Sequence, residues 1–552
     1  MQSILLSLKT TCRTSWEVLR DRGPSQLQFW FIALVIGLAS GAAAVVFRLG
    51  IETLQGWLYG TGDIGMLHTW AATLPWYTVL ILPILGGLAV GLILDRFTPD
   101  GRVRSVADVI EGAALNNGRV EVRAGLASAV ASLITLSSGG SSGREGPVVH
   151  LAGVISTKVS AFIKADGITG RDLLGCAVAA AVSASFNAPI AGSLFALEVI
   201  LRHFALHAFA PIAIASVAGT VVSRLYFGNF TEFGFPAQSM LSFYQELPAY
   251  MLLGLLCGAV AIVLMRTIFW FDDLGTAAHT RTGLPRWTRP MMAGALLGVL
   301  AIFFPHIIGV GYETTSAALS GGLLLHEAVV FCMLKVVAVA ITMAGRMGGG
   351  VFSPSLMVGA LTGLAFGLIA TSIFPTVSGS VTLYALAGMG AVAASVLGAP
   401  ISTTLIVFEL TGNWQTGLAV MVSVSLSTAL SARFVTQSFF LTQIERRGVH
   451  LAAGPQAYLL ATFGVLQMMR GPDHPRAAPE QRCQDMIGES LYVLDTATLE
   501  TAMPIFEATN EVFLPVVSLQ DDQPRLIGAL FQVDALKAYN RALAATAAEE
   551  HS

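Results

Sequence analysis

Charged residues are scarce in this sequence of 552 residues. Asp, Glu, Lys and Arg together make up only 12% of it, whereas soluble domains contain about 25%. Hydrophobic residues make up 54%, and the mean hydropathy is +0.70. These values exclude an ordinary soluble protein and predict a chain that crosses a membrane several times. The net charge of −3 gives no reason to expect a nucleic-acid partner.

Cysteine and the common catalytic motifs are equally sparse. The five cysteines are scattered without the spacing of a metal site, and three of them lie in apolar segments. Neither a metal centre nor a disulfide framework is therefore expected. The sequence also lacks a phosphate-binding loop and a nucleophile elbow. It predicts a protein without a cofactor that is not an enzyme.

Apolar segments are abundant between residue 29 and about residue 442. Several are near or above the length that spans a bilayer: 29–49, 77–94, 250–265 and 359–373. Others are shorter and are broken by Gly, Ser and Pro, a pattern typical of transport sites. Residues 1–28 precede the first apolar run, and their basic residues predict a cytoplasmic lead-in.

One polar stretch, residues 136–150 (LSSGGSSGREGPVVH), lies between two apolar segments. Pro147 marks the start of a helix there. A helix N-terminus has free N–H groups and a favourable dipole, which together form an anion site. Glu145 would compete with a soluble anion for these donors. The alternative is an ordinary polar loop in which Glu145 pairs with Arg144.

The chain contains an internal repeat. Two apolar stretches, 211 residues apart, each carry a proline followed nine residues later by a glutamate: Pro189 with Glu198, and Pro400 with Glu409. The residues GREGP at 143–147 have a counterpart in GVFSP at 350–354, at nearly the same offset. The order and spacing indicate two halves, at about 75–230 and 246–442. Two sets of broken helices suggest half-helix N-termini that meet near the membrane midplane and attract anions.

The composition becomes polar after residue 447. Residues 448–490 are predicted to be a linker, and residues 491–552 a small α/β unit. Within that unit, the pattern predicts a helix at 496–508 and a closing helix at 533–545. Between them it predicts two strands, at 513–518 and 526–531, joined by a turn at 520–525.

These motifs together resemble the CLC family of chloride channels and proton-coupled chloride transporters. GREGP matches the family's gate motif, GVFSP its second anion-site motif, and NAPIAG at 187–192 and GAPI at 398–401 its paired interface helices. The resemblance covers residues 30–447, within a transmembrane domain placed at 29–447. It implies an all-α polytopic membrane protein of two inverted-topology repeats of broken, tilted helices, plus a small C-terminal cytoplasmic α/β segment.

The resemblance also implies an assembly and a location. The family forms homodimers in which each subunit has its own pore. Small residues on the interface helices would allow close contact between subunits: Ala191, Gly192, Ser402 and Thr403. Both termini are expected in the cytoplasm, and the protein in a bacterial inner membrane. Its expected partners are a small anion, membrane lipid and a second copy of itself.

Each residue of the family's anion site has a counterpart here. Glu145 would be the gating glutamate, whose carboxylate occupies an anion position until it is displaced or protonated. The anion-binding positions would be Ser105, Gly146, Pro147, Val148, Val149, Val351, Phe352 and Phe440. Most of them would act through backbone amides. Pro147 has no N–H and would only shape the turn.

Three positions depart from the family's pattern. Ser105 lacks its usual glycine neighbours and could equally be the N-cap of a short helix. Phe440 replaces an inner tyrosine, and a phenyl ring cannot donate a hydrogen bond. Val199 stands at the internal proton-transfer position of coupled members, so that part of the proton pathway is lost. The roles of two ionisable residues remain open. His150 is either a pH sensor or a packed side chain, and Lys335 has either a functional or a structural role.

The tail resembles a single CBS motif, from residue 492 to about 543. Such motifs pair, so one copy per chain would meet its mate across the dimer. Phe531 replaces the hydroxyl that contacts nucleotide three residues before Asp534. A dimerisation tail without nucleotide is therefore the favoured interpretation.

The sequence thus predicts a glutamate-gated protein that moves chloride or a similar small anion passively. Three alternatives remain: a chloride/proton antiporter with a non-standard inner proton route, a fluoride-transporting member, and a sensor whose pore is vestigial.

Overall fold

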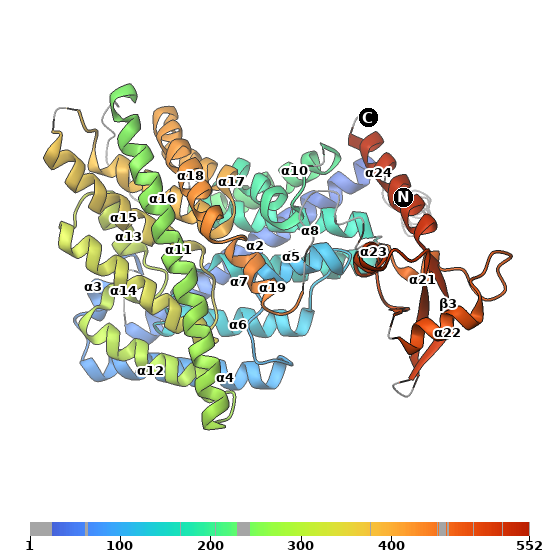
Figure 1. Cartoon of the computed structure of the whole chain (residues 1–552). Helices are drawn as coiled ribbons and strands as arrows, with labels where there is room; N and C mark the ends of the chain where they lie inside the picture. Colours follow the sequence, from blue (N-terminus) through green and yellow to red (C-terminus); the bar gives the residue numbers. More distant parts are fainter. Residues whose placement is uncertain are drawn as a thin grey trace, which may run out of the picture. The chain divides into compact units, whose positions relative to one another are not determined.

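The computed structural model describes residues 25–60, 64–165, 167–204, 206–228, 243–375, 377–449, 451, 460, 463–489, 491–520 and 523–550. Most of the predicted N-terminal lead-in lies outside the described residues. The chain divides into two compact units: residues 1–201 with 208–447, and residues 448–552 with 202–207. Figure 1 traces their elements in chain order.

The first unit is built from helices. Its first half contains α2 (Gln26–Tyr59), η1 (Ile64–Met66), α3 (Leu67–Ala71), α4 (Trp76–Phe97), α5 (Val106–Leu115), α6 (Val122–Ser138), α7 (Glu145–Ile163), α8 (Gly167–Phe186), α9 (Pro189–Phe195), η2 (Ala196–Leu201) and α10 (Leu206–Phe227). Its second half contains α11 (Phe243–Thr282), α12 (Thr288–Phe303), η3 (Pro305–Ile307), α13 (Tyr312–Leu319), α14 (Leu325–Ala344), α15 (Phe352–Ile373), α16 (Val381–Leu397), α17 (Pro400–Thr411), α18 (Trp414–Phe434) and α19 (Phe439–Glu445).

This unit contains both long and short helices. Among the described residues, eight helices are long and apolar enough to cross a membrane, which confirms the prediction of a multi-span membrane protein. The helices α5, α13 and α19 have only seven to ten residues. At 1.5 Å per residue they reach at most about half of a 30 Å hydrocarbon core. The predicted broken helices are therefore present.

The sequence repeat is also a repeat of backbone conformation. Helices α9 and α17 both begin with proline, and the alanines before them have similar dihedral angles (Ala188 φ −129°, ψ 85°; Ala399 φ −130°, ψ 60°). Gly143 and Gly350, at corresponding places before α7 and α15, bond to each other in an antiparallel bridge. Their two N–H···O distances are 2.7 and 2.8 Å. The two halves therefore meet directly at the paired motifs.

Two glutamates fasten the halves together a second time. The carboxylate of Glu198 accepts hydrogen bonds from the amides of Ile401 and Ser402 at the start of α17, at 2.9 and 2.8 Å, and from the Ser402 hydroxyl. The carboxylate of Glu409 accepts from Ile190 and Ala191 at the start of α9, at 3.0 and 2.7 Å. Each glutamate thus caps the equivalent helix of the other half.

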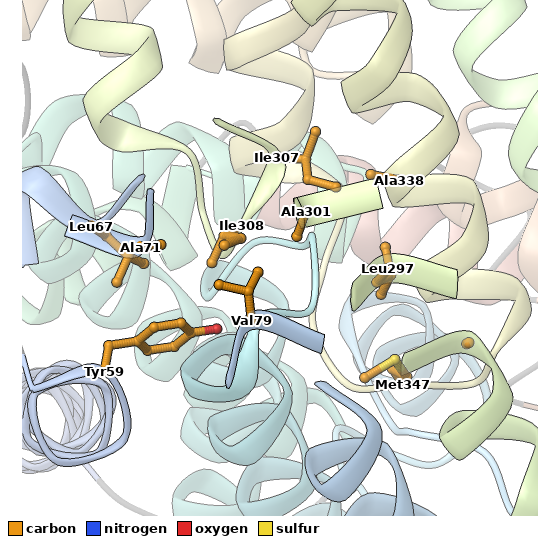
Figure 2. Packing of buried hydrophobic residues seen from close by; sticks show 11 residues of the cluster. Tyr59, Leu67, Ala71, Val79, Leu297, Ala301, Ile307, Ile308, Ala338 and Met347 are labelled. Atoms are coloured by element: carbon orange, nitrogen blue, oxygen red, sulfur yellow. The ribbon is translucent and has the colours of Figure 1, made fainter. Parts of the chain in front are cut away.

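A buried apolar cluster supports the segment that leads into α13. Figure 2 shows Tyr59 of α2, Val79 of α4, Leu297 of α12 and Ala338 of α14 around Ile307 and Ile308. Close packing of this kind holds the segment between α12 and α13 in place. It therefore fixes the position of Tyr312, the first residue of α13.

The second unit contains α21 (Val465–Met468), α22 (Glu480–Gly488), β1 (Val493–Leu494), α23 (Leu499–Thr509), β2 (Phe513–Gln520), β3 (Gln523–Phe531) and α24 (Gln532–Glu550). The sheet order is β1-β2-β3, with β1 parallel and β3 antiparallel to β2. The predicted order of helix, strand, strand and helix is confirmed. The two-residue strand β1 was not predicted, because it is too short to show a pattern.

The predicted linker needs a correction. Val465 and Met486, which lie within the segment assigned as linker, are buried in one cluster with Phe506 and Leu514. Helix α22 is amphipathic and buries Cys483 and Met486 on one face while exposing charged residues. The described residues 463–489 therefore belong to the folded unit, although their polar composition suggested otherwise.

Candidate anion site

A cavity in the first unit brings together five of the predicted site residues. Its lining includes Ser105, Gly146, Val351, Phe352 and Phe440. These come from the start of α5, the start of α7, the turn into α15 and the first turn of α19. Residues more than 300 positions apart in the sequence therefore lie around one space.

The carboxylate of Glu145 lies where the two halves meet. The residue is 2% exposed. Its Oε1 accepts hydrogen bonds from the Ser353 hydroxyl at 2.6 Å and from the Tyr312 hydroxyl at 3.4 Å. Its Oε2 has no hydrogen-bond partner among the described residues. The negative charge thus sits beside the N-termini of α7 and α15, where helix dipoles favour it.

The alternative interpretation, in which Glu145 pairs with Arg144, does not fit this geometry. The Arg144 guanidinium donates to the carbonyl of Ser185 at 3.2 Å and lies 5.1 Å from the centre of the Tyr312 ring. Both carboxylate contacts of Glu145 are neutral hydroxyl groups. The stretch is therefore a structured junction between the halves.

The amides of the gate motif are not all equivalent. The Val148 amide donates to the Arg144 carbonyl at 3.2 Å, so in this conformation its N–H is already engaged, and its predicted contact with an anion stays a prediction. Val149 lies further inside α7, where N–H groups bond to carbonyls four residues back. Pro147 has no N–H. Gly146 lines the cavity and lies in the first turn, where amides lack an intrahelical partner.

The turn into α15 depends on glycine. Gly349 has a φ of +121°, a conformation that other residues rarely adopt. A Cβ atom there would lie 2.0 Å from the Ser142 hydroxyl. That hydroxyl donates to the carbonyl of Gly348 at 3.0 Å. The close approach of the two motifs therefore requires the absence of a side chain.

The position of Ser105 is compatible with both interpretations that the sequence left open, and its role as an anion ligand stays a prediction. It is the N-cap residue of α5, and it also lines the cavity. Asp108, which replaces the family's usual proline, accepts a hydrogen bond from the Ser105 amide at 2.7 Å and pairs with Arg447 at 2.7 Å. The departure from the family's motif therefore supplies a carboxylate that holds the serine backbone in place.

Phe440 lies in an aromatic group at the cavity. It is buried and in edge contact with Phe439, which stacks on Phe269 at 5.1 Å between ring centres. The guanidinium of Arg446 lies 5.0 Å from the Phe269 ring. At this position the cavity wall is therefore apolar.

Arginines that sequence reasoning did not assign to the site dominate the charge of the cavity. Its charged lining residues are Arg102, Arg346, Arg446, Arg447 and Asp272. Four guanidinium groups line the cavity against one carboxylate, although Arg446 and Arg447 also pair with Asp273 and Asp108 outside the lining. Guanidinium groups in the wall favour the entry of anions. No sequence pattern links these arginines to the site, although Arg446 and Arg447 are adjacent. Their convergence depends on the fold.

The remaining predicted positions lie away from the cavity lining. Val199 is buried in η2, a π-helical turn that packs against α5. Lys335 is fully buried in α14, and its ammonium donates to the carbonyls of Ile307 and Gly309 at 3.3 and 3.0 Å. This arrangement favours its structural interpretation. The described residues contain no group of three or more His, Cys, Asp or Glu side chains placed to hold a metal.

Comparison with known proteins gives a consistent result. The family model described as voltage gated chloride channel matches residues 86–432. A ClcB-like protein of Ralstonia nicotianae is 31% identical over 396 residues, covering 71% of this chain and 91% of the relative. The voltage-gated ClC-type chloride channel ClcB of Escherichia coli is 30% identical over 423 residues, covering 74% and 97%.

Solved structures share the fold at low sequence identity. A slow cyanobacterial Cl−/H+ antiporter matches with a TM-score of 0.68 and 19% identity, covering 77% of this chain and 98% of that structure. A CLC-type fluoride/proton antiporter matches with a TM-score of 0.62 and 18% identity, covering 75% and 96%. These similarities concern the architecture of the membrane unit.

Proposed function

Because the chain belongs to the CLC family of chloride channels and antiporters, we propose that it conducts chloride or a similar small anion passively and that Glu145 is its gate. The protein is an integral membrane protein with several spans, and its family moves anions across membranes. Passive conduction and the gate go beyond what membership of the family establishes.

The observation that carries the proposal is the place of the Glu145 carboxylate. It is buried beside the N-termini of α7 and α15, and one of its oxygens is bound by the Ser353 and Tyr312 hydroxyls. An ionised carboxylate in this place competes with an anion for the same amides. A proton removes its charge and weakens the hydrogen bonds that it accepts from the Ser353 and Tyr312 hydroxyls. The side chain then leaves, and an anion takes its place.

Two features favour passive conduction over coupled exchange. Valine at position 199 cannot carry a proton, and Phe440 has no hydroxyl to bind the ion. Glu198, which could have substituted for the missing acid, is engaged as the cap of α17. A proton-coupled exchanger is the second candidate, because the gate helix contains a buried titratable side chain, His150.

The test is simultaneous measurement of chloride and proton flux in liposomes that hold a chloride gradient. Passive conduction predicts chloride flux with no uphill proton movement. Sustained uphill proton pumping at a fixed ratio to chloride contradicts it and supports the exchanger. Competition between fluoride and chloride decides the fluoride alternative. Absence of any anion flux from the full-length protein supports the sensor alternative.

We further infer that the functional unit is a homodimer, although not for the reason that the sequence suggested. Ala191, Gly192, Ser402 and Thr403 are buried within the single chain, and a Cβ on Gly192 would meet the carbonyl of Ala179 at 2.8 Å. These residues therefore serve packing inside the subunit. Large apolar side chains on the same two helices, Ile190 and Ile401, are exposed and available to a partner.

The second unit is proposed to act as a dimerisation tail without nucleotide. The Asp534 carboxylate, three residues after the position at which the family's nucleotide-contacting hydroxyl is replaced by Phe531, accepts from Arg470 Nε at 2.7 Å. The Arg470 guanidinium also lies 3.9 Å from the centre of the Phe531 ring. A side chain of the unit itself therefore contacts both residues, which supports the interpretation without nucleotide.

A further inference from the structure

Tyr312, the first residue of α13, contacts the gate motif through two parts of its side chain. Its hydroxyl donates to Glu145 Oε1 at 3.4 Å. The guanidinium of Arg144 lies 5.1 Å from the centre of its ring, a distance at which a cation is attracted to an aromatic face. Tyr312 belongs to the second half of the unit, whereas both contacts are with the first half. Whatever fixes the start of α13 therefore also fixes the hydroxyl that binds the proposed gate.

The next residue, Glu313, binds the start of α13 to α3. Its Oε2 accepts hydrogen bonds from the amides of His68 and Thr69 at 2.8 and 3.3 Å and lies 2.9 Å from His68 Nδ1. Its Oε1 accepts from the Thr69 hydroxyl. Burial alone would raise the pKa of the Glu313 carboxyl, but hydrogen bonds from His68 and Thr69 lower it below its ordinary value. An ionised carboxylate thus uses both oxygens to hold the first turn of α3.

Stacked rings hold α3 beside the segment that leads into α13. The ring centres of His68 and His306 lie 4.3 Å apart, and His306 stacks on Phe331 of α14 at 4.0 Å. Gly311, directly before Tyr312, has a φ of +88°, and glycine leaves the backbone of such a turn conformationally free. The position of Tyr312 therefore depends on the side-chain contacts around it.

The contact between α3 and α13 and the arginine-lined cavity lie at opposite faces of the membrane. Helices α2 and α4 are both long and apolar enough to cross it, and α3 lies between them in the chain. Arg102, which lines the cavity, comes shortly after the end of α4 at Phe97. One crossing thus separates the two places, and Tyr312 reaches Glu145 from the side of α3.

We propose that Glu313 is a positioning residue of the gate: it binds α13 to α3 and thereby holds the Tyr312 hydroxyl on the Glu145 carboxylate. While this anchor is intact, two hydroxyl groups keep the carboxylate in the anion position. When the anchor is lost, Tyr312 withdraws, the Ser353 hydroxyl is left to hold the carboxylate, and the gate opens more often. The inference rests on the proposed role of Glu145 as the gate.

The experiment measures chloride flux in liposomes at a fixed neutral pH. Tyr312→Phe removes only the hydroxyl, and the loss of one hydrogen bond to the proposed gate should raise flux about two- to ten-fold. Glu313→Gln removes the charge that binds α3 and should change flux in the same direction. Because both changes act through one contact, the double variant should conduct no faster than Tyr312→Phe alone. Thr69→Val, which lacks the hydroxyl that Glu313 binds, replaces Glu313→Gln if that variant does not fold.

The matched control is Tyr250→Phe. The Tyr250 hydroxyl also donates to a glutamate, Glu246, at 3.4 Å, but in helix α11, and its removal should leave flux as in the wild type. The two test variants are then combined with Glu145→Ala, which leaves no carboxylate to hold. In that background, Tyr312→Phe and Glu313→Gln should no longer change flux.

Four results contradict the inference or one of its parts. Unchanged or reduced flux in Tyr312→Phe, an equal rise in Tyr250→Phe, or a rise that persists in Glu145→Ala overturns the role of Tyr312 and with it the inference. A rise in Tyr312→Phe without one in Glu313→Gln and Thr69→Val overturns the role of Glu313. Absence of anion flux in the wild type, or a pH dependence of flux that survives Glu145→Ala, overturns the proposed function instead.

Discussion

The two halves of the first unit have similar backbone conformations, but they carry different side chains at the point where they meet. In the first half the chain passes Gly143 and enters α7 at Glu145, and in the second it passes Gly350 and enters α15 at Phe352. Corresponding positions therefore carry a carboxylate in one half and a phenyl ring in the other. The shared backbone supplies amides and dipoles from both sides, and the single charged side chain supplies the proposed control.

At a second pair of corresponding positions, both halves carry a glutamate, and the two glutamates make the same kind of contact. Glu198 lies in the π-helical turn η2, whereas Glu409 lies in the regular helix α17. Despite this difference in helix type, both carboxylates bind two backbone amides of the partner half. These two glutamates therefore have one structural task. The comparison teaches that equal sequence spacing predicts equal geometry but does not by itself predict equal function.

The largest expected effect is on the gate. Replacing Glu145 by Gln or Ala should abolish the pH dependence of chloride flux, because no titrating group then competes with the anion. Phe352→Leu, at the corresponding position of the other half, should keep the pH dependence, because it contributes through its backbone. Flux measured in liposomes between pH 4 and 8 tests the contrast. Equal loss of pH dependence in both variants would contradict the proposal that only the first half controls flux through a side chain.

The next effect concerns the two caps. Glu198→Gln and Glu409→Gln should each destabilise the protein by about 1–3 kcal/mol, since each loses charge-assisted hydrogen bonds to two amides. Thermal unfolding in detergent measures both, and the two decreases should be similar. Both variants should retain chloride flux. A loss of proton movement confined to Glu198→Gln would instead identify Glu198 as a proton donor.

A smaller effect is expected at Ser353. Its hydroxyl donates to the Glu145 carboxylate at 2.6 Å and so holds that side chain in place. In Ser353→Ala this hydrogen bond is lost, the proposed gate is held less firmly, and chloride flux at a fixed neutral pH should rise by about two- to ten-fold. Ser355→Ala is a suitable control, because that hydroxyl bonds to the carbonyl of Val351. A flux that falls or stays constant in Ser353→Ala contradicts this contact.

The smallest effect is expected from the tail. Deleting the residues after Arg447 should leave a dimer, because the exposed apolar side chains on α9 and α17 belong to the membrane unit. Light scattering after size-exclusion chromatography in detergent measures the mass. A monomeric product would show that the second unit is necessary for assembly.

The sequence alone was sufficient to predict the class of fold, the repeat and the motifs around the cavity. Periodicity and composition are local properties, and the breaks in apolar segments are visible without a structure. The cavity arginines could not be assigned in the same way, because Arg102 and Arg346 come together only through folding. The partners of Glu198 and Glu409 were hidden for the same reason. Met486 was missed because its surroundings are polar, although one face of α22 is apolar.

The reciprocal caps have a consequence for the order in which the chain is made. The amides at the start of α9 are bonded by a glutamate that the ribosome adds more than 200 residues later. At about 5–20 residues per second, that glutamate follows after roughly 10–40 s. During this interval the first half is already long enough to insert, yet its amides at α9 still require water, lipid headgroups or a chaperone. Synthesis of the second half therefore supplies the hydrogen-bond acceptor that the first half lacks. A nascent chain that stalls before residue 409 should be a preferred substrate for membrane proteases.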